Sequence, residues 1–273
     1  MVVASRRPTW QFLGSVARNR RTLYVMTRFW LAEKHSGTLM GTWWALIQPT
    51  FFALFYLVIF TLVFPSRFQT TGGATTQYSL YLLAGLIPWF TFQSVLTTSP
   101  QALTGNPSLV RNASFPIELF PVRTVVIALF TWVSGTVITL VAAAAINPAS
   151  WRMWLTLPLL LGLQVLAMTG WALALAVLGV FVRDLSQVIA LLAMPALFLM
   201  PVFYPIDTAP AVFKGVMLLN PWTYMVLCYQ DVYVYGAFTH PLAWLVFIAF
   251  AALSVPLGIR ILRRSSTVVV SAL

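Results

Sequence analysis

Long uncharged stretches most limit what this chain can fold into. Six apolar stretches contain almost no Asp, Glu, Lys or Arg. A helix needs about 20 apolar residues to cross the roughly 30 Å hydrocarbon core of a bilayer. The chain is 60% hydrophobic and 8% charged, whereas soluble domains are about 25% charged. Soluble globular, disordered and coiled-coil folds are therefore excluded, and we expect an all-α integral membrane protein.

We predict six membrane spans from these stretches. The fourth is long enough to require a tilted helix, and the fifth is short and interrupted by Pro195 and Pro201. Residues 1–42 form a cytoplasmic tail with an interface helix, 43–261 one six-helix transmembrane domain, and 262–273 a C-terminal tail. The spans lie near 43–64, 78–97, 122–146, 153–182, 188–204 and 241–261.

Positive charge is distributed unevenly between the two sides of this topology. Six spans place both termini on one side, and that side holds 13 of the 16 Lys and Arg residues. Lys and Arg collect in cytoplasmic loops, so we expect both termini in the cytoplasm. The net charge of +11 is then an orientation signal and does not indicate nucleic-acid binding. The 13 residues are Arg6, Arg7, Arg18, Arg20, Arg21, Arg28, Lys34, Arg111, Arg123, Arg183, Arg260, Arg263 and Arg264; the other three are Arg67, Arg152 and Lys214.

Two segments outside the spans are also rich in apolar residues. Residues 8–34 mix them with arginines, which predicts an amphipathic helix in the cytoplasmic interface; the alternative is a poorly ordered basic tail. Residues 205–240 contain two runs, 211–219 and 222–234, that are too short to span. They predict short re-entrant or interfacial gate helices on the outer side, and a plain aromatic belt is the alternative. The aromatic residues suited to interfacial depth are Trp222, Tyr224, Tyr229, Tyr233 and Tyr235.

The predicted spans carry almost no residues for chemistry. The five acidic residues lie in or beside loops, whereas an ion-coupled carrier usually keeps a carboxylate near the midplane. His35 and His240 fall at opposite faces and cannot form a catalytic pair. One cysteine, Cys228, excludes an intrachain disulfide and, with two histidines, a Cys/His zinc site. No G-x-x-x-x-G-K-[ST] phosphate loop is present. We predict a transporter subunit, not an enzyme, that holds no metal and takes its energy from another polypeptide.

The arrangement of the spans suggests where that partner acts. No internal repeat is visible, which favours a pore formed between two copies of the chain. The loop near 98–121 is expected in the cytoplasm, starts a helix at Ser99-Pro100, and ends in the proline-bounded segment 115–121. A short helix there would present a docking surface; a plain connector is the alternative.

Several segments together resemble ABC-2 type permeases of the polysaccharide-export branch. Each motif is short, but their order and spacing are similar to that family over about residues 30–262. The segments are 81–90 (YLLAGLIPWF), 115–121 (FPIELFP), 39–44 (LMGTWW) with Pro49, 181–185 (FVRDL), 201–205 (PVFYP) and 220–224 (NPWTY).

The resemblance implies a homodimer in the bacterial inner membrane that pairs with two copies of a cytoplasmic ABC ATPase. ATP and Mg²⁺ would bind to that partner, and the cargo would be a lipid-linked polysaccharide such as an O-antigen-like glycan or teichoic acid. It also implies a coupling helix and an outer gate. Coupling residues would be Pro100, Gln101, Leu103, Asn106, Leu109 and Arg111; gate residues would be Tyr204, Asn220, Trp222, Tyr224 and Tyr229.

Two positions depart from the family pattern. The basic pattern before span one is reduced to residues 33–37 (EKHSG), and Gln230 stands where relatives often carry Arg. The first departure affects contacts near the inner entrance, and the second affects polar contacts of the gate.

Aromatic side chains can stack on sugar rings without fixing a register, so we expect some of them to line the channel. The alternative is that these residues face lipid or neighbouring helices. The candidates share helical spacing on spans one and five, and they are Trp44, Gln48, Phe51, Phe55, Met194 and Phe198. A drug- or lipid-exporting permease of the same superfamily remains an alternative, as does a channel or carrier without an ATPase.

Overall fold

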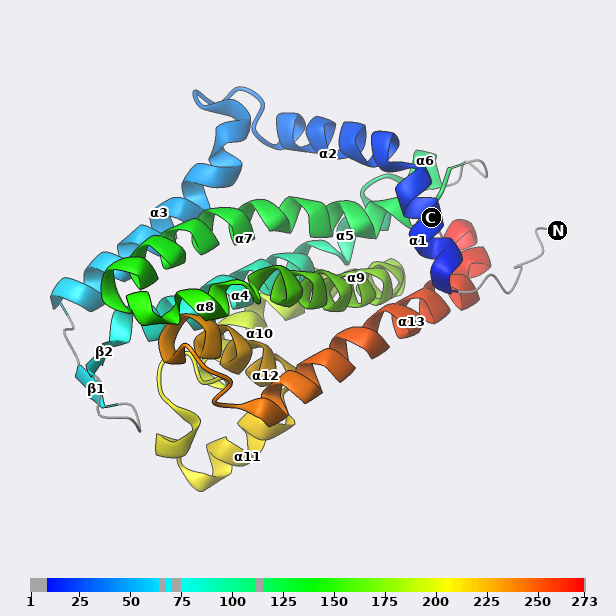
Figure 1. Cartoon of the computed structure of the whole chain (residues 1–273). Coiled ribbons are helices and arrows are strands. Elements are labelled where there is room, and N and C mark those ends of the chain that lie inside the picture. Colours follow the sequence, from blue (N-terminus) through cyan, green and yellow to red (C-terminus); the bar gives the residue numbers. More distant parts are fainter. Residues whose placement is uncertain (1–8, 64–66, 70–74, 111–114, 273) are drawn as a thin grey trace.

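The computed structural model describes residues 9–63, 67–69, 75–110 and 115–272, and it shows an elongated bundle of helices (Figure 1). The all-α prediction is confirmed. Within the described ranges, strands occur only in one antiparallel pair, β1 (Arg67–Gln69) and β2 (Thr75–Gln77), with Phe68 opposite Thr76. This short hairpin connects the first two membrane helices.

In the part of the chain that the structure describes, five helical segments are long and apolar enough to cross a membrane. A sixth crossing is made by shorter pieces, described below. The five are Gly41–Val58, which joins η1 (Gly41–Trp43) to α3 (Trp44–Val58); α4 (Tyr78–Thr98); α7 (Leu119–Ile146); α9 (Leu157–Phe181); and α13 (Pro241–Ala272).

Shorter elements connect these spans. A π-helical turn, η2 (Ile59–Val63), extends α3, and η3 (Pro148–Ser150) with α8 (Trp151–Trp154) joins α7 to α9. Proline at the first or second helical position begins both η3 and α9, where a missing N–H costs nothing. The predicted fourth span, 153–182, is therefore shorter in the structure, because the chain turns at Leu155 and Thr156 before α9 begins.

The predicted fifth span, 188–204, is helical only in part. Helix α10 (Leu185–Phe198) has 14 residues, which corresponds to about 21 Å of helix and falls short of a bilayer core. The chain nevertheless crosses the bundle. Ser186 contacts Gln101 at the end where the termini lie, and Pro201 contacts Tyr81 near the opposite end of α4. Irregular backbone from Leu199 to Tyr204 completes the sixth crossing.

The last helix continues through the segment that we predicted as a C-terminal tail, 262–273. It extends to Ala272 because Leu262 and Val269 are buried. Both residues pack in a cluster with Phe12 from α1 (Thr9–Arg18). The two ends of the chain therefore form part of one small core, and Figure 1 shows α1 beside the end of α13.

Close contact between α9 and α13 holds the centre of the bundle together. A methyl group at Gly170 would overlap the backbone carbonyl of Ser254, and one at Gly258 would overlap the carbonyl of Gly170. Small residues let membrane helices approach this closely, which matters because lipid provides no hydrophobic drive for helices to associate. These glycines set the distance between the two helices.

Candidate translocation and coupling surfaces

The loop between α4 and α7 contains two single-turn helices, α5 (Gln101–Thr104) and α6 (Pro107–Val110). Their inner side joins the core cluster at this end of the molecule, through Leu103 and Val110. Their outer side is open: Gln101 is exposed and Leu109 is 42% exposed. The loop thus has one anchored face and one free face, as a docking element requires.

The predicted coupling residues divide between these two faces. Pro100 and Leu103 are buried, Asn106 is half-buried, and Gln101 and Leu109 are exposed. Arg111 lies outside the described residues. Among the coupling residues that the structure describes, Gln101, Asn106 and Leu109 are the candidates for direct contact with a partner.

The coupling loop is tied to three other parts of the chain. The Gln101 side-chain amide donates a hydrogen bond to Ser186 Oγ on α10 at 2.9 Å. Ser15 Oγ on α1 donates one to Glu118 Oε1 at 2.8 Å. A methyl group at Gly179 would overlap the Pro100 carbonyl, so the loop lies against the backbone of α9. A displacement of the loop would therefore be passed to α1, α9 and α10.

The predicted channel residues of span one form a stripe along α3. Trp44, Phe51 and Phe55 are 38%, 62% and 50% exposed, and Gln48 is exposed between them. The rings of Phe51 and Phe55 stack with centroids 6.3 Å apart. The opposite side of α3 packs on the bundle, where Ala53 contacts Leu83 and Ile87 of α4. The stripe therefore points away from the chain's own core.

The two predicted channel residues of α10 are also on the surface. Met194 is 74% exposed and Phe198 is 53% exposed. Phe198 stacks on Phe203 at 4.9 Å, and no contact between described rings joins it to Phe51 or Phe55. All six channel candidates are thus exposed on the single chain, in two separate groups. Their role as channel lining stays a prediction.

The segment after α10 forms a bent hairpin, as predicted for the gate region. It comprises η4 (Ile206–Thr208), α11 (Ala211–Leu219), α12 (Pro221–Gln230) and the π-helical turn η5 (Asp231–Tyr235). The axis turns by 93° between α11 and α12. Asn220 at the bend accepts a hydrogen bond from the Trp222 backbone N–H at 3.0 Å and so caps α12. Within this hairpin, α11 is largely exposed and α12 is buried in the bundle.

Side chains from α4, from the hairpin and from Tyr204 donate hydrogen bonds to the backbone carbonyls at and after the end of α10. Unpaired backbone groups at membrane depth cost several kcal/mol each, so such a segment needs donors. Among the predicted gate residues, Tyr204 and Asn220 supply two. The Tyr204 hydroxyl donates to the Phe198 carbonyl, and the Asn220 amide donates to the Leu199 carbonyl. The Tyr81 hydroxyl and the Gln230 amide both donate to the Pro201 carbonyl. The Tyr78 hydroxyl donates to the Phe203 carbonyl.

Gln230 therefore has a clear contact, although it departs from the family pattern. Its side-chain amide donates to the Pro201 carbonyl at 2.6 Å, and the residue is fully buried. The amide oxygen Oε1 is buried and has no hydrogen-bond partner among the described residues.

Two of the aromatic residues expected at interfacial depth are buried inside the bundle. Tyr229 and Tyr233 are 1% and 2% exposed. The Tyr229 hydroxyl donates to Gln164 Oε1 at 2.6 Å and accepts from Trp132 Nε1 at 2.9 Å. Helix α12 inserts between α4, α9 and α13, and η5 contacts α4 and α7, so helices enclose both side chains. Their depth in the membrane stays a prediction.

Trp222 also packs against side chains of other helices. Its ring lies 5.3 Å from that of Trp171 on α9 and 5.9 Å from that of Trp89 on α4. Phe92 and Phe250 complete this aromatic cluster. Tyr224 is half-buried, as Trp222 is, and its hydroxyl donates to the Leu218 carbonyl. The five predicted gate residues thus belong partly to a surface and partly to a packed core.

A buried carboxylate holds the C-terminal part of the hairpin in place, although the sequence analysis placed this residue in or beside a loop. Asp231 is fully buried. It accepts hydrogen bonds from Trp244 Nε1 at 2.9 Å and the His240 backbone N–H at 3.1 Å, and it pairs with His240 Nδ1 at 2.7 Å. One signal was available: Asp231 lies within the apolar run 222–234, where a buried acid needs partners.

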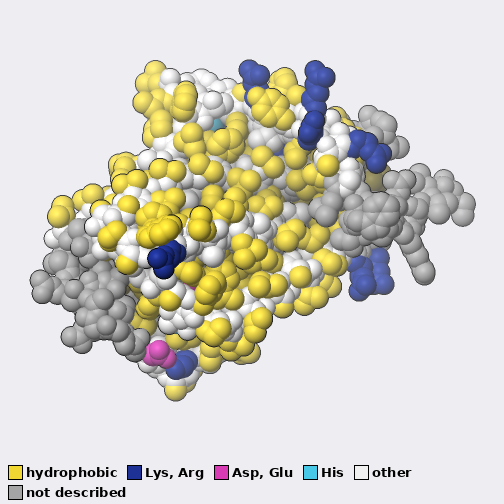
Figure 2. Space-filling view, in the orientation of Figure 1, with side chains coloured by type: hydrophobic (Ala, Val, Ile, Leu, Met, Phe, Trp, Pro, Cys, Tyr) yellow, Lys and Arg dark blue, Asp and Glu magenta, His cyan; other side chains and the backbone are white. Residues whose placement is uncertain are grey.

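No cluster of His, Cys, Asp or Glu within the described ranges could hold a metal ion. The described surface is dominated by apolar side chains on the face shown in Figure 2. Lys and Arg gather on that face over the N-terminal helices and near the chain ends, which agrees with the charge asymmetry in the sequence.

Comparison with known proteins decides the family. The profile of the ABC-2 type transporter family matches residues 21–234. The chain belongs to this family. It is accordingly a multi-pass membrane protein of the permease type, and the resemblance noted from its motifs is confirmed.

Three similar proteins cover most of the chain. The O-antigen export system permease protein RfbA of Klebsiella pneumoniae is 26% identical over 220 residues, or 80% of this chain and 82% of that protein. A protein of the same name in Myxococcus xanthus is 26% identical over 207 residues, 74% and 76% of the two chains. The polysialic acid transport protein KpsM of Escherichia coli is 24% identical over 188 residues, 68% and 71%.

Proposed function

We propose that the chain is the permease subunit of an ABC exporter that moves a lipid-linked polysaccharide across the bacterial inner membrane. The names of the similar O-antigen and polysialic acid proteins support this class of cargo. The structural observation that carries the proposal is the exposed stripe of Trp44, Gln48, Phe51 and Phe55. Aromatic faces flanking an amide suit a sugar chain, which presents apolar ring faces and hydroxyl groups.

In this proposal, the pore forms between two copies of the chain. The stripe on α3 and the exposed residues of α10 point away from the core of one chain, so a second copy is needed to enclose a path. Symmetric pairing about an axis along the membrane normal would bring both stripes to one seam. The gate hairpin would lie at the outer mouth of that seam.

The energy source is a separate cytoplasmic ATPase, present in two copies, that binds ATP and Mg²⁺. Both termini and the loop containing α5 and α6 are on its side, in the cytoplasm, as the excess of Lys and Arg there supports. The exposed residues Gln101 and Leu109 would contact the ATPase. Closure of the two ATPase subunits would push the loop, and its contacts with α9 and α10 would open the seam. This chain itself performs no catalysis.

Reconstitution provides the test. The permease and its ATPase would be placed in proteoliposomes, and transfer of lipid-linked glycan between leaflets would be measured together with ATP hydrolysis. We expect the F51A/F55A variant to assemble with the ATPase and to lose most glycan transfer.

The matched control removes two exposed aromatics elsewhere, Phe29 and Phe238, which are 72% and 57% exposed. This F29A/F238A variant should keep full transfer. Unchanged transfer by F51A/F55A would contradict the stripe as the glycan path. Stimulation of ATP hydrolysis by apolar drugs and not by lipid-linked glycan would contradict the cargo class.

A further inference from the structure

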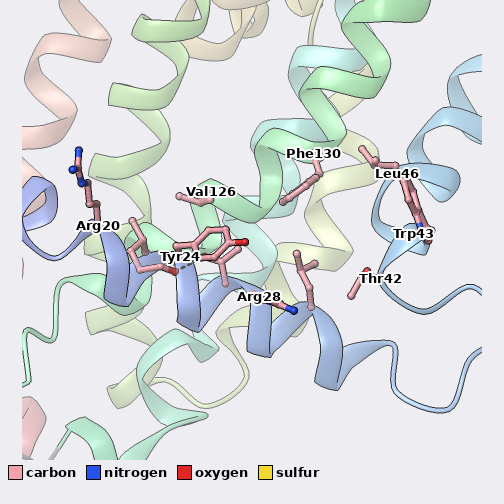
Figure 3. Close-up of a pocket in the computed structure, with 11 residues that line it drawn as sticks. Arg20, Tyr24, Arg28, Thr42, Trp43, Leu46, Val126 and Phe130 are labelled. Carbon is pink, nitrogen blue, oxygen red and sulfur yellow. Dashed lines mark hydrogen bonds between the residues drawn. The ribbon is translucent and has the colours of Figure 1, made fainter.

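A cavity lies beneath the second N-terminal helix, α2 (Arg20–Lys34), between this helix, α7 and the start of α3. Its volume is about 540 Å³, within the roughly 300–1,000 Å³ range of small-molecule sites. Most of its lining is apolar, with Leu46, Val126 and Phe130 on the wall opposite α2. In Figure 3, Val126 and Phe130 lie across the cavity from α2, and Leu46 lies at one side, near Trp43.

Two arginines from α2 lie along this apolar cavity. Arg20 lies at one end, and Arg28 extends toward the other end near Thr42 and Trp43 (Figure 3). Within the described residues, the ion pairs are Lys214 with Asp207 and His240 with Asp231, so neither arginine of the cavity has an acidic partner. The cavity therefore combines an apolar interior with two cationic groups that no carboxylate neutralises.

The cavity is on the side of α3 opposite the exposed stripe. Residues on an α-helix are about 100° apart, so Leu46 lies about 200° from Gln48 around the axis. Leu46 lines the cavity, while Gln48 and Phe51 belong to the stripe. A molecule in the cavity is therefore separated from a path along the stripe by the helix itself.

We propose that this cavity binds an anionic phospholipid from the leaflet next to α2. The acyl chains would occupy the apolar space against α7, and the phosphate would lie between Arg20 and Arg28, where arginine can donate two parallel hydrogen bonds to its oxygens. A soluble anion would gain nothing from the apolar lining. A zwitterionic lipid would satisfy the two cations less well. This inference does not depend on the cargo.

The site gives α2 a defined role. A basic amphipathic helix binds a membrane surface through apolar burial and attraction to anionic lipids. Here one lipid would fill the space between that helix and α7 and α3. The lipid thereby fixes the position of the helix that leads into the first span.

Native mass spectrometry of the assembled permease–ATPase complex tests the proposal. The complex would be incubated with equal amounts of phosphatidylglycerol and phosphatidylcholine that carry the same acyl chains. We expect one phosphatidylglycerol per permease chain to remain bound. Since each basic residue near a membrane surface contributes about one kcal/mol, removal of one arginine should weaken retention about five-fold and R20Q/R28Q about 25-fold.

The control variant R18Q/R21Q removes the same charge from residues that do not line the cavity, and it should retain the lipid. Val126→Trp would fill the cavity while leaving both arginines, and it should also lose the lipid. Val133→Trp, two turns further along α7 and 50% exposed, is its control and should not.

Three results would overturn the proposal. The first is equal lipid retention by R20Q/R28Q and R18Q/R21Q. The second is displacement of the lipid by inorganic phosphate alone, which would indicate a soluble-anion site. The third is preferential binding of a polyprenyl diphosphate over phosphatidylglycerol, which would make the cavity a cargo site.

Discussion

The first two membrane helices have similar apolar composition and opposite surroundings. In the most apolar part of α4, 78% of the residues are buried, whereas in the segment containing α3 the share is 6%. Helix α4 contacts α7, α9, α10 and α12, while α3 packs on α7 and α4 along one side only. Apolar character therefore determines that a helix enters the membrane and does not determine what it contacts there. The exposed helix is where cargo, lipid or a second chain can bind.

The largest expected effect compares one aromatic residue from each helix. Phe92 on α4 is fully buried and Phe51 on α3 is 62% exposed. We expect Phe92→Ala to lower the free energy of unfolding by about 3 kcal/mol, at the low end of values for soluble cores because lipid is as apolar as the lost packing partners. Phe51→Ala should change it by less than about 0.5 kcal/mol. Thermal unfolding in detergent measures both, and equal effects would contradict the contrast.

The next effect concerns the close packing of α9 on α13. Gly170→Ala would force a methyl group into the Ser254 backbone, and we expect a loss of about 1–3 kcal/mol. Gly162 is on the same helix and has nothing within 4 Å of an added methyl group. Gly162→Ala should therefore be neutral or slightly stabilising. The two variants would be compared by thermal unfolding of the purified protein. If Gly170→Ala unfolded at the same temperature as the unmodified protein, α9 and α13 could move apart at no cost in stability, which would contradict the prediction.

A smaller effect is expected for one hydroxyl group in the buried hairpin. Tyr229→Phe leaves Gln164 Oε1 and Trp132 Nε1 without their shared partner, at a cost of about 1–2 kcal/mol. Tyr224→Phe removes a hydroxyl near the surface, where water can replace it, and should cost less than about 0.5 kcal/mol. The free energy of unfolding of both variants would be measured by denaturation in mild detergent. A larger loss for Tyr224→Phe than for Tyr229→Phe would contradict the conclusion that Tyr229 is on the buried side of the hairpin and Tyr224 on the surface side.

The sequence predicted the crossings well because their signal is local. Each crossing needs only enough apolar residues in succession, and the structure shows helices in all six predicted spans. The bend between 211–219 and 222–234 was predicted for the same reason, because Asn220-Pro221 separates two short runs. The end of α10 at Phe198 was not predicted, because it depends on donors such as Tyr81 and Gln230 that are distant in sequence.

The candidate sites were less predictable because exposure depends on tertiary packing. Helical spacing grouped Trp44, Gln48, Phe51 and Phe55 on one face, and the structure shows that this face is exposed. Spacing could not show that Trp222 and Tyr229 turn inward, since an aromatic residue with a polar group suits both an interface and a hydrogen-bonded core. The cavity under α2 was not foreseen, because it requires three segments to leave space between them.

The irregular backbone after α10 also constrains the order in which the chain can enter the membrane. Synthesis proceeds from the N-terminus, so Tyr78 and Tyr81 are already in place when residues 199–204 arrive. Asn220 and Gln230, which complete the pairing of the Leu199 and Pro201 carbonyls, are made later. Until Asn220 and Gln230 are made, the backbone carbonyls of the fifth crossing lack these hydrogen-bond donors, and the hydrocarbon of the membrane cannot replace them. The fifth crossing and the hairpin should therefore insert as one unit, sheltered from lipid until both are complete.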